Sequence, residues 1–295
     1  MQRSRAGART LIRELRNLAL VATVCYGSFA CLPDPLEVRN IPVAKPEIVV
    51  SSQIIPDGSL VVFLTKTFGA LEASNDSDPF DLIRQISIDD ALVVLEGRNS
   101  MDTLLPLSHG IYGGINLPLV PGNEYTLRVN SPSMGMVEAT TTVASQVLFE
   151  SLSVDRYFNG FDDTLVQVSY VIEDPAVKNQ YMINVQRFSL RDDIADRLLG
   201  PRVYTKLIDD TQYDGGIIAD TLRATPRDFA RGDTVAVFLS NIQQSYYDFM
   251  KLRLDNRVGF VEFISEPVNY PSNVTGGRGF FNLHVPDIRL FILDE

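Results

Sequence analysis

Short runs in which apolar and polar residues alternate dominate the chain after Pro46, and glycine- and proline-containing turns separate them. Alternation with a period of two places successive side chains on opposite faces of a β-strand. Glycine and proline interrupt such runs, because glycine accepts positive φ and proline has no backbone N–H. The pattern therefore restricts the chain to all-β architectures in which at least one face of each sheet is buried.

The first half of this pattern begins with a hairpin. Residues 47–55 and 59–67 read as two strands, and Pro56-Asp57-Gly58 between them is typical of a turn. Residues 81–85 predict one helical turn, and further strands are expected at residues 91–96, 124–129 and 136–143. Short strands separated by turns favour a sandwich of Ig-like or transthyretin-like size. We expect this domain to cover residues 47–145, with a boundary near residues 144–146.

The second half predicts a β-rich domain over residues 146–295. Strands are expected at residues 147–154, 164–172, 181–188, 234–239 and 281–293. The one convincing helix covers residues 241–255, where Ile242, Tyr246 and Phe249 share a face that Met250 and Leu254 widen. Residues 190–233 and 266–280 predict irregular loops. The fold class expected is therefore all-β, with two Ig-like or transthyretin-like sandwiches in tandem and one short helix in the second.

The N-terminal residues 1–31 have the order of an export signal. Five arginines come first, an apolar run at residues 18–24 follows, and Ala30 precedes Cys31. The apolar run is too short to span a bilayer, which needs about 20 residues, but fits a signal peptide. A small residue directly before a cysteine is the arrangement of a bacterial lipoprotein. We therefore predict a lipoprotein signal peptide at residues 1–30 and lipidation at Cys31.

Two features leave alternatives open at this signal. Ser28 stands three residues before Cys31, where leucine is usual, and Cys25 is a rival site with a poorly fitting Val24 before it. An ordinary cleaved signal with a chance cysteine, or an amphipathic helix, would explain the same residues. Four prolines between residues 31 and 46 predict an extended tether after the anchor.

Charge and cysteine content exclude some classes of protein. Residues 1–30 contain five of the 26 basic residues and one of the 37 acidic residues. The rest of the chain therefore has 21 basic and 36 acidic residues, a net charge of −15. So acidic a chain is not expected to bind nucleic acid, whose phosphates attract basic surfaces. Cys25 and Cys31 are the two cysteines, so a chain cleaved before Cys31 has no intrachain disulfide.

No catalytic constellation is apparent, and we expect neither an enzyme nor a cofactor. The two histidines, His109 and His284, are far apart in the sequence and are best read as loop or surface residues. Motifs of serine hydrolases, zinc proteases and nucleotide-binding loops are absent. Residues 276–279, Gly-Gly-Arg-Gly, resemble a phosphate-binding loop only superficially and predict a turn, with a ligand role as the alternative.

Acidic pairs are the strongest candidates for a metal site. The pairs are Asp89-Asp90, Asp162-Asp163, Asp192-Asp193 and Asp209-Asp210. Residues 75–78, and Asp209-Asp210 together with Asp214-Gly215, have the oxygen density that Ca²⁺ prefers but no EF-hand pattern. Solvated loop charge explains such pairs more simply, so we predict no metal site and leave a weak Ca²⁺ site among the acidic loops open.

Three further motifs have simple structural interpretations. Arg231-Gly232-Asp233 spells an integrin-type tripeptide but precedes a predicted strand, which favours a turn. Asn273-Val274-Thr275 is a glycosylation sequon that a bacterial lipoprotein would not normally use. The chain has no tryptophan for a carbohydrate platform, and the face formed by Tyr246 and Phe249 is better explained as core.

Several segments resemble the domain-of-unknown-function family 4249 of Bacteroidota lipoproteins. They are the leader to Cys31, the hairpin at residues 48–67, and the blocks at residues 91–95, 110–112, 121–129, 246–247, 266–269 and 273–281. The resemblance covers nearly the whole mature chain, and its most specific motif is the terminal one, Glu266-Pro-Val-Asn together with Asn273–Phe281. It implies an outer-membrane lipoprotein that partners a TonB-dependent receptor, and it carries no catalytic residues.

The sequence therefore predicts a non-catalytic, lipid-anchored outer-membrane accessory or binding protein that partners a TonB-dependent receptor in uptake. A surface adhesin or structural Ig-like lipoprotein is the alternative, since sandwich modules on a tether suit both roles. The residues after Cys31 do not decide between the periplasmic and the cell-surface face, and the ligand is not indicated by the sequence.

Overall fold

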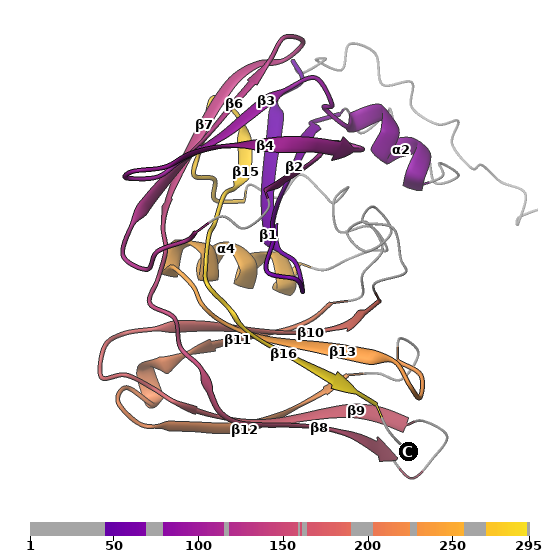
Figure 1. Cartoon of the computed structure of the whole chain (residues 1–295), viewed down its shortest axis with the longest axis vertical. Helices are drawn as coiled ribbons and strands as arrows, with labels where there is room; N and C mark the ends of the chain where they lie inside the picture. Colours follow the sequence, from indigo (N-terminus) through magenta and orange to yellow (C-terminus); the bar gives the residue numbers. More distant parts are fainter. Residues whose placement is uncertain are drawn as a thin grey trace, which may run out of the picture. The chain divides into compact units, whose positions relative to one another are not determined.

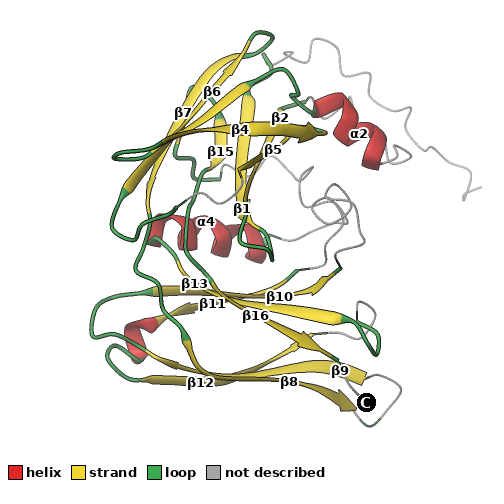
Figure 2. Cartoon of the chain, viewed as in Figure 1, coloured by secondary structure: helices red, strands yellow, loops and turns green. Residues whose placement is uncertain are grey.

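The computed structural model describes residues 45–68, 79–114, 118–158, 160, 164–189, 203–224, 229–256 and 270–293. The predicted signal peptide, Cys31 and nearly all of the tether lie outside these residues. Residues Lys45–Glu295 belong to one compact unit, and its described part is mostly β-sheet with few helices, as predicted (Figures 1 and 2). None of the described helices combines the length and apolar character needed to cross a membrane.

A nine-stranded sheet holds the first core. Its order is β14-β7-β6-β3-β4-β5-β2-β1-β15. The strands are β1 (Ile48–Ile54), β2 (Leu60–Lys66), β3 (Leu92–Glu96), β4 (Met101–Ser108), β5 (Ile111–Gly114), β6 (Glu124–Ser131), β7 (Gly135–Thr142), β14 (Val274–Thr275) and β15 (Arg278–Phe280). The predicted β1–β2 hairpin is confirmed, with Ile54 opposite Leu60. Helix α2 (Pro79–Ile86) extends the helical turn predicted at residues 81–85.

The two end strands of this sheet follow one another in the sequence. Only Gly276 and Gly277 separate β14 from β15. Strand β14 pairs antiparallel with β7, and β15 pairs parallel with β1. The two ends of the sheet order therefore lie close together at this turn. The prediction of a loop over residues 266–280 is wrong at these two strands.

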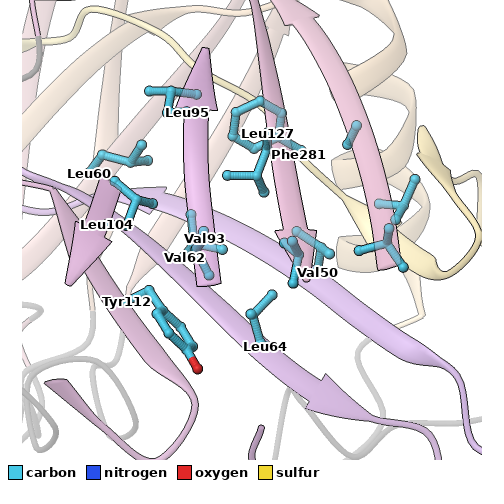
Figure 3. Packing of buried hydrophobic residues seen from close by; sticks show 14 of the residues in the cluster. Val50, Leu60, Val62, Leu64, Val93, Leu95, Leu104, Tyr112, Leu127 and Phe281 are labelled. Atoms are coloured by element: carbon cyan, nitrogen blue, oxygen red, sulfur yellow. The ribbon is translucent and has the colours of Figure 1, made fainter. Parts of the chain in front are cut away.

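Alternating side chains from this nine-stranded sheet fill the first core. Strand β1 alternates buried and half-buried residues along its whole length. Val50, Leu64, Leu127 and Phe281 meet inside, although Phe281 comes from the far end of the sequence (Figure 3). Tyr112 lies at the border of this cluster, where its hydroxyl donates to the Ile88 carbonyl at 2.9 Å. A buried tyrosine thus keeps a hydrogen bond for its polar end.

Two facing sheets form the second core. A three-stranded sheet has the order β12-β9-β8, and a four-stranded sheet has the order β11-β10-β13-β16 (Figure 1). Val168 from the first sheet and Ile183 and Val237 from the second are fully buried in one cluster. The strands are β8 (Phe149–Phe158), β9 (Thr164–Glu173), β10 (Gln180–Phe188), β11 (Tyr204–Asp209), β12 (Ile217–Ala224), β13 (Thr234–Asn241) and β16 (Asp287–Ile292).

Core membership changes between Val143, in the first cluster, and Val147, in the second. The chain also returns to the first sheet at β14 and β15 before it adds β16 to the second. The first core is therefore completed by residues from the far end of the sequence.

Helix α4 (Gln244–Asp255) is the helix predicted at residues 241–255. Tyr246 and Met250 are buried in a cluster with Met182 of β10 and Phe280 of β15. Phe249 is half-buried and its ring lies 5.0 Å from that of Phe280. The interpretation of the Tyr246 and Phe249 face as core is confirmed, because aromatic pairs at this spacing stabilise packing.

Candidate functional site

Three carboxylates lie together at one end of the two facing sheets that form the second core. Asp174 follows β9, Asp210 opens the short 3₁₀ helix η1 (Asp210–Gln212) after β11, and Asp214 lies two residues beyond that helix. One carboxylate oxygen from each lies within 4.8 Å of the others. Both connections, β9 to β10 and β11 to β12, cross between the two sheets at this end. The crossings bring together residues that are far apart in the sequence.

Hydrogen bonds hold Asp174 in a fixed orientation. Its Oδ1 accepts from the Tyr181 hydroxyl, and its Oδ2 accepts from the Gly215 backbone N–H at 3.0 Å. The Asp174 N–H donates to the Gly216 carbonyl at 2.9 Å. The carboxyl is therefore tied to both β10 and the turn before β12. Burial is the main cause that raises the pKa of Tyr181, followed by its bond to Asp174 and the charges of Asp174 and Asp210.

Asp210 is the most deeply buried of the three, with 1 % of its surface exposed. Its Oδ2 accepts from the Asn179 backbone N–H, and the Asn179 side chain is in turn held by Asn241 at 2.8 Å. Its Oδ1 is buried and accepts no hydrogen bond from any residue that the structure describes. A buried polar atom without a partner is uncommon and costly, so this oxygen needs an explanation.

The charges near Asp210 are unfavourable to its ionised form. Burial raises its pKa, and the negative charges of Asp174, Asp209 and Asp214 raise it further, against the lowering effect of the Asn179 N–H. Among the described residues, no ion pair involves any of the three clustered carboxylates. The group is thus a concentration of oxygen atoms and negative charge of the type that hard cations bind.

The sequence identified part of this cluster. Asp210 and Asp214 were among the predicted oxygen-rich residues, and the structure brings them together. Asp209 points elsewhere: its Oδ1 accepts from the Thr211 N–H at 3.0 Å and caps the 3₁₀ helix. Asp174 was not predicted as a ligand, because nothing in the sequence indicates that the ends of β9 and β11 lie together.

The other acidic pairs have different placements. Asp89 accepts from the Gly110 N–H at 2.6 Å, and Asp90 accepts from the Ser131 hydroxyl at 2.6 Å. Both therefore fasten loops of the first sheet. Hydrogen bonds from Ser131 and Ser133 lower the pKa of Asp90. Three candidates lie outside the described residues: Asp162-Asp163, Asp192-Asp193 and residues 75–78.

The two histidines occupy unrelated places. His284 is buried beside Asn282, whose Nδ2 lies 3.1 Å from His284 Nδ1, and burial lowers its pKa to about 4. It is therefore neutral at physiological pH. It lies in the loop between β15 and β16, in agreement with the loop interpretation, but it is not a surface residue, because it is only 6 % exposed. His109 lies in the β4–β5 turn with a positive φ of 52°.

In the Gly-Gly-Arg-Gly segment, Gly276 and Gly277 form a closely packed turn, as predicted, whereas Arg278 and Gly279 lie in β15. A Cβ on Gly277 would lie 2.5 Å from the Ile48 carbonyl oxygen, and one on Gly279 would lie 2.0 Å from that of Val50. Arg278 forms an ion pair with Glu47. The glycines thus allow this segment to lie close to the backbones of β1 and β7, which gives it a structural role.

Asn273 fastens the same turn from its other side. Its Nδ2 donates to the Thr140 and Phe281 carbonyls at 3.2 and 2.7 Å, and its Oδ1 accepts from the Phe281 N–H at 2.9 Å. The sequon asparagine is thus a structural residue. In Arg231-Gly232-Asp233, the Asp233 carboxylate accepts from the Ala230 N–H at 2.7 Å, which confirms the predicted turn.

Comparison with known proteins connects these features to a family. No curated protein was found that matches the chain. A family model described as "Domain of unknown function (DUF4249)" matches residues 34–285, which is most of the chain and includes most of both cores and all three clustered aspartates. This match confirms the resemblance deduced from the sequence motifs. The chain belongs to the DUF4249 family.

Proposed function

We propose that the chain acts as a non-catalytic, lipid-anchored accessory or binding protein of the outer membrane. The observation that carries this proposal is the leader, in which a basic region and a short apolar run end at Ala30 and Cys31. Two or more acyl chains on one residue give stable membrane attachment, where a single chain gives only reversible binding. Membership of the DUF4249 family is consistent with such a role and assigns no activity to the chain.

The described residues support a binding role over a catalytic one. His284 is buried, neutral and held beside Asn282, so it is not placed to act as a general base on an external substrate. The Gly276–Gly279 segment is filled by its own backbone contacts with β1 and β7, which leaves it little room for a phosphate. His284 and the Gly276–Gly279 segment thus serve to hold the fold together.

Attachment through Cys31 is tested by substitution. Cys31→Ala should abolish fatty-acid labelling and move the protein from the membrane to the soluble fraction. Cys25→Ala is the matched control, and it should leave labelling and fractionation unchanged. Retention of label in Cys31→Ala together with its loss in Cys25→Ala would place the anchor at the other cysteine.

A TonB-dependent receptor is the proposed partner, on the basis of the family resemblance. The mature protein should co-purify with a β-barrel receptor from detergent-solubilised outer membrane, and this association should not require nucleic acid. Recovery of the protein alone, under detergent conditions that preserve known membrane complexes, would contradict the partnership. Protease treatment of intact cells then tests the alternative, because a surface adhesin would be digested and a periplasm-facing protein would survive.

A further inference from the structure

We propose that Asp174, Asp210 and Asp214 bind a divalent cation of the calcium type between the two connections that cross from sheet to sheet. The inference is independent of the proposed membrane role. It rests on the geometry of the three carboxylates, on the burial of two of them, and on the buried Asp210 Oδ1 that has no hydrogen-bond partner among the described residues.

The spacing of the oxygens fits one shared cation. Ca²⁺ binds oxygens at about 2.3–2.6 Å, so two ligands of one ion lie at most about 5 Å apart. One oxygen from each aspartate lies within 4.8 Å of the others, which is inside this limit. An ion placed among them would meet three carboxylates from two separate connections, and backbone carbonyls or water would complete a shell of six to eight oxygens.

Burial distinguishes this cluster from ordinary loop charge. Asp174 and Asp210 are 4 % and 1 % exposed, whereas Asp214 is exposed. Burying an ionised carboxylate without a compensating charge is expensive, and two such groups side by side repel each other. Solvated loop aspartates carry no such cost, because water surrounds them. A cation is the partner that would offset both the burial and the repulsion.

The cation would lie next to Asp210 Oδ1, the buried carboxylate oxygen that has no hydrogen-bond partner among the described residues. The Asn179 N–H satisfies Oδ2 of the same carboxylate, and Asn241 fixes Asn179 in turn. The carboxylate is therefore held in place by one oxygen while the other remains buried and unpaired. The same division applies in part to Asp174, whose bonds to Tyr181 and Gly215 leave lone pairs on both oxygens for an ion.

The described surroundings supply no competing positive charge to the cluster. The charges that act on Asp210 come from Asp174, Asp209 and Asp214, and all are negative. Lys178 lies close enough to lower the pKa of Asp209, which faces Thr211 and not the cluster. Tyr181, the remaining titratable group in contact, donates its hydroxyl to Asp174 and stays neutral.

The choice of calcium follows from the type and arrangement of the donors. All three side chains offer carboxylate oxygen, which suits Ca²⁺ and Mg²⁺ more than thiol- or imidazole-preferring metals. Mg²⁺ requires near-octahedral geometry and keeps several of its waters, whereas Ca²⁺ accepts irregular shells. A site assembled from two loops, with two buried carboxylates and one exposed, matches the irregular case.

Calcium titration of the full mature protein in detergent, after removal of metal with a chelator, tests the proposal. Calorimetry should show one Ca²⁺ per chain with a dissociation constant of about 10⁻⁴–10⁻³ M, the range of extracellular sites. At about ten times that concentration, the unfolding midpoint should rise by about 3–6 °C. An equal rise with MgCl₂, or no heat and no shift with CaCl₂, would overturn the proposal.

Three variants locate the site. Asp210→Asn should unfold at an equal or higher temperature than the wild type without metal, because it removes a buried negative charge, and should lose the calcium response. Asp214→Asn, at an exposed position, should fold normally and bind calcium at least about tenfold more weakly. Asp155→Asn removes one exposed carboxylate of β8 and should bind as the wild type does. Unchanged binding in both cluster variants would place the calcium elsewhere.

Discussion

At the scale of single residues, the close approach of β15 to β1 requires glycine at position 279. Gly279 has φ of +98°, and its Cα faces the carbonyl of Val50. His284 and Asn282 are buried together beneath the same region. The sequence predicted a turn at these glycines. It did not predict the buried histidine, because its neighbours come from the tertiary fold.

Gly279→Ala is expected to be strongly destabilising. The substitution adds the cost of a positive φ, about 1–2 kcal/mol, to the cost of forcing Val50 away from a Cβ placed 2.0 Å from its carbonyl oxygen. The free energy of unfolding should fall by about 2–5 kcal/mol in a urea titration. Gly58→Ala is the control, because Gly58 has φ of +83° with nothing within 4 Å of the added Cβ. Equal losses in both variants would remove the steric argument.

Because of His284, the free energy of unfolding should decrease at acidic pH. Burial lowers the pKa of the folded residue to about 4, from an ordinary value of 6.5. The unfolded chain therefore binds the proton first, so stability is full above pH 6.5 and decreases as the pH falls from 6.5 towards 4. The total loss is about 3 kcal/mol. In His284→Gln, the loss of unfolding free energy between pH 6.5 and pH 4 should be smaller by that amount, as measured by chemical denaturation at each pH. An equal pH dependence in the variant and the wild type would contradict the burial of His284.

At the scale of elements, the strands with clean alternation were predictable, as were the continuous apolar runs of β2 and β13. Strands β6 and β9 alternate in sequence and were expected within one or two residues of their observed ends. Strand β4 was missed because its residues Leu104-Leu105-Pro106-Leu107 do not alternate and most of its side chains are exposed. Strands β11 and β12 lie in a stretch whose acidic residues suggested a loop. Sheet pairing overrides weak local preference in these cases.

The carboxylate cluster was predictable only in part, for a related reason. Asp210 and Asp214 are close in sequence, so their oxygen density was visible. Asp174 joins them because Glu173 at the end of β9 pairs with Ile217 at the start of β12. Asp209 pairs with Gln180 at the start of β10. Register of this kind follows from packing of whole sheets and is not encoded in any short motif.

Asn273→Ala should loosen the junction of the two sheet ends. The substitution removes three hydrogen bonds, two donated to carbonyls and one accepted from the Phe281 N–H. At about 1 kcal/mol for each bond, stability should fall by about 2–3 kcal/mol. Amide hydrogen exchange should quicken first in β14 and β15. Asn130→Ala, at an exposed position of β6, is the control and should change stability by no more than about 0.5 kcal/mol.

Phe280→Ala tests the packing of helix α4. Phe280 is 5 % exposed, and its ring lies 5.5 Å from that of Tyr246 and 5.0 Å from that of Phe249. Removing a buried phenylalanine costs about 3–5 kcal/mol, because a cavity remains where the ring was. Thermal unfolding should show this loss. The matched variant Phe158→Ala, at a position 59 % exposed on β8, should change stability little, and similar losses in both would contradict the assignment of this cluster as core.

At the scale of the whole molecule, the all-β class was correctly predicted, and the return of the chain to the first sheet was not. The turn-rich composition of residues 266–280 obscured the two short strands that complete that sheet. Each is too short for a periodic pattern to be visible. Their place at the two ends of one sheet explains why Asn273–Phe281, part of the most specific motif of the family resemblance, is rich in glycine.

The charge of the molecule agrees with the proposed location. A mature chain with 36 acidic and 21 basic residues is repelled by anionic lipid surfaces. Electrostatic adsorption is therefore a poor means of holding such a protein at a membrane, and a covalent lipid is an effective one. The same negative charge would raise the local concentration of divalent cations around the molecule.

Mass spectrometry of the native protein's N-terminal peptide tests the proposed membrane attachment most directly. The mature protein from native membranes should begin at Cys31, with a diacylglycerol on its thiol and an acyl chain on its amine. A mature protein that begins at any other residue, or at Cys31 without lipid, would contradict the proposed attachment.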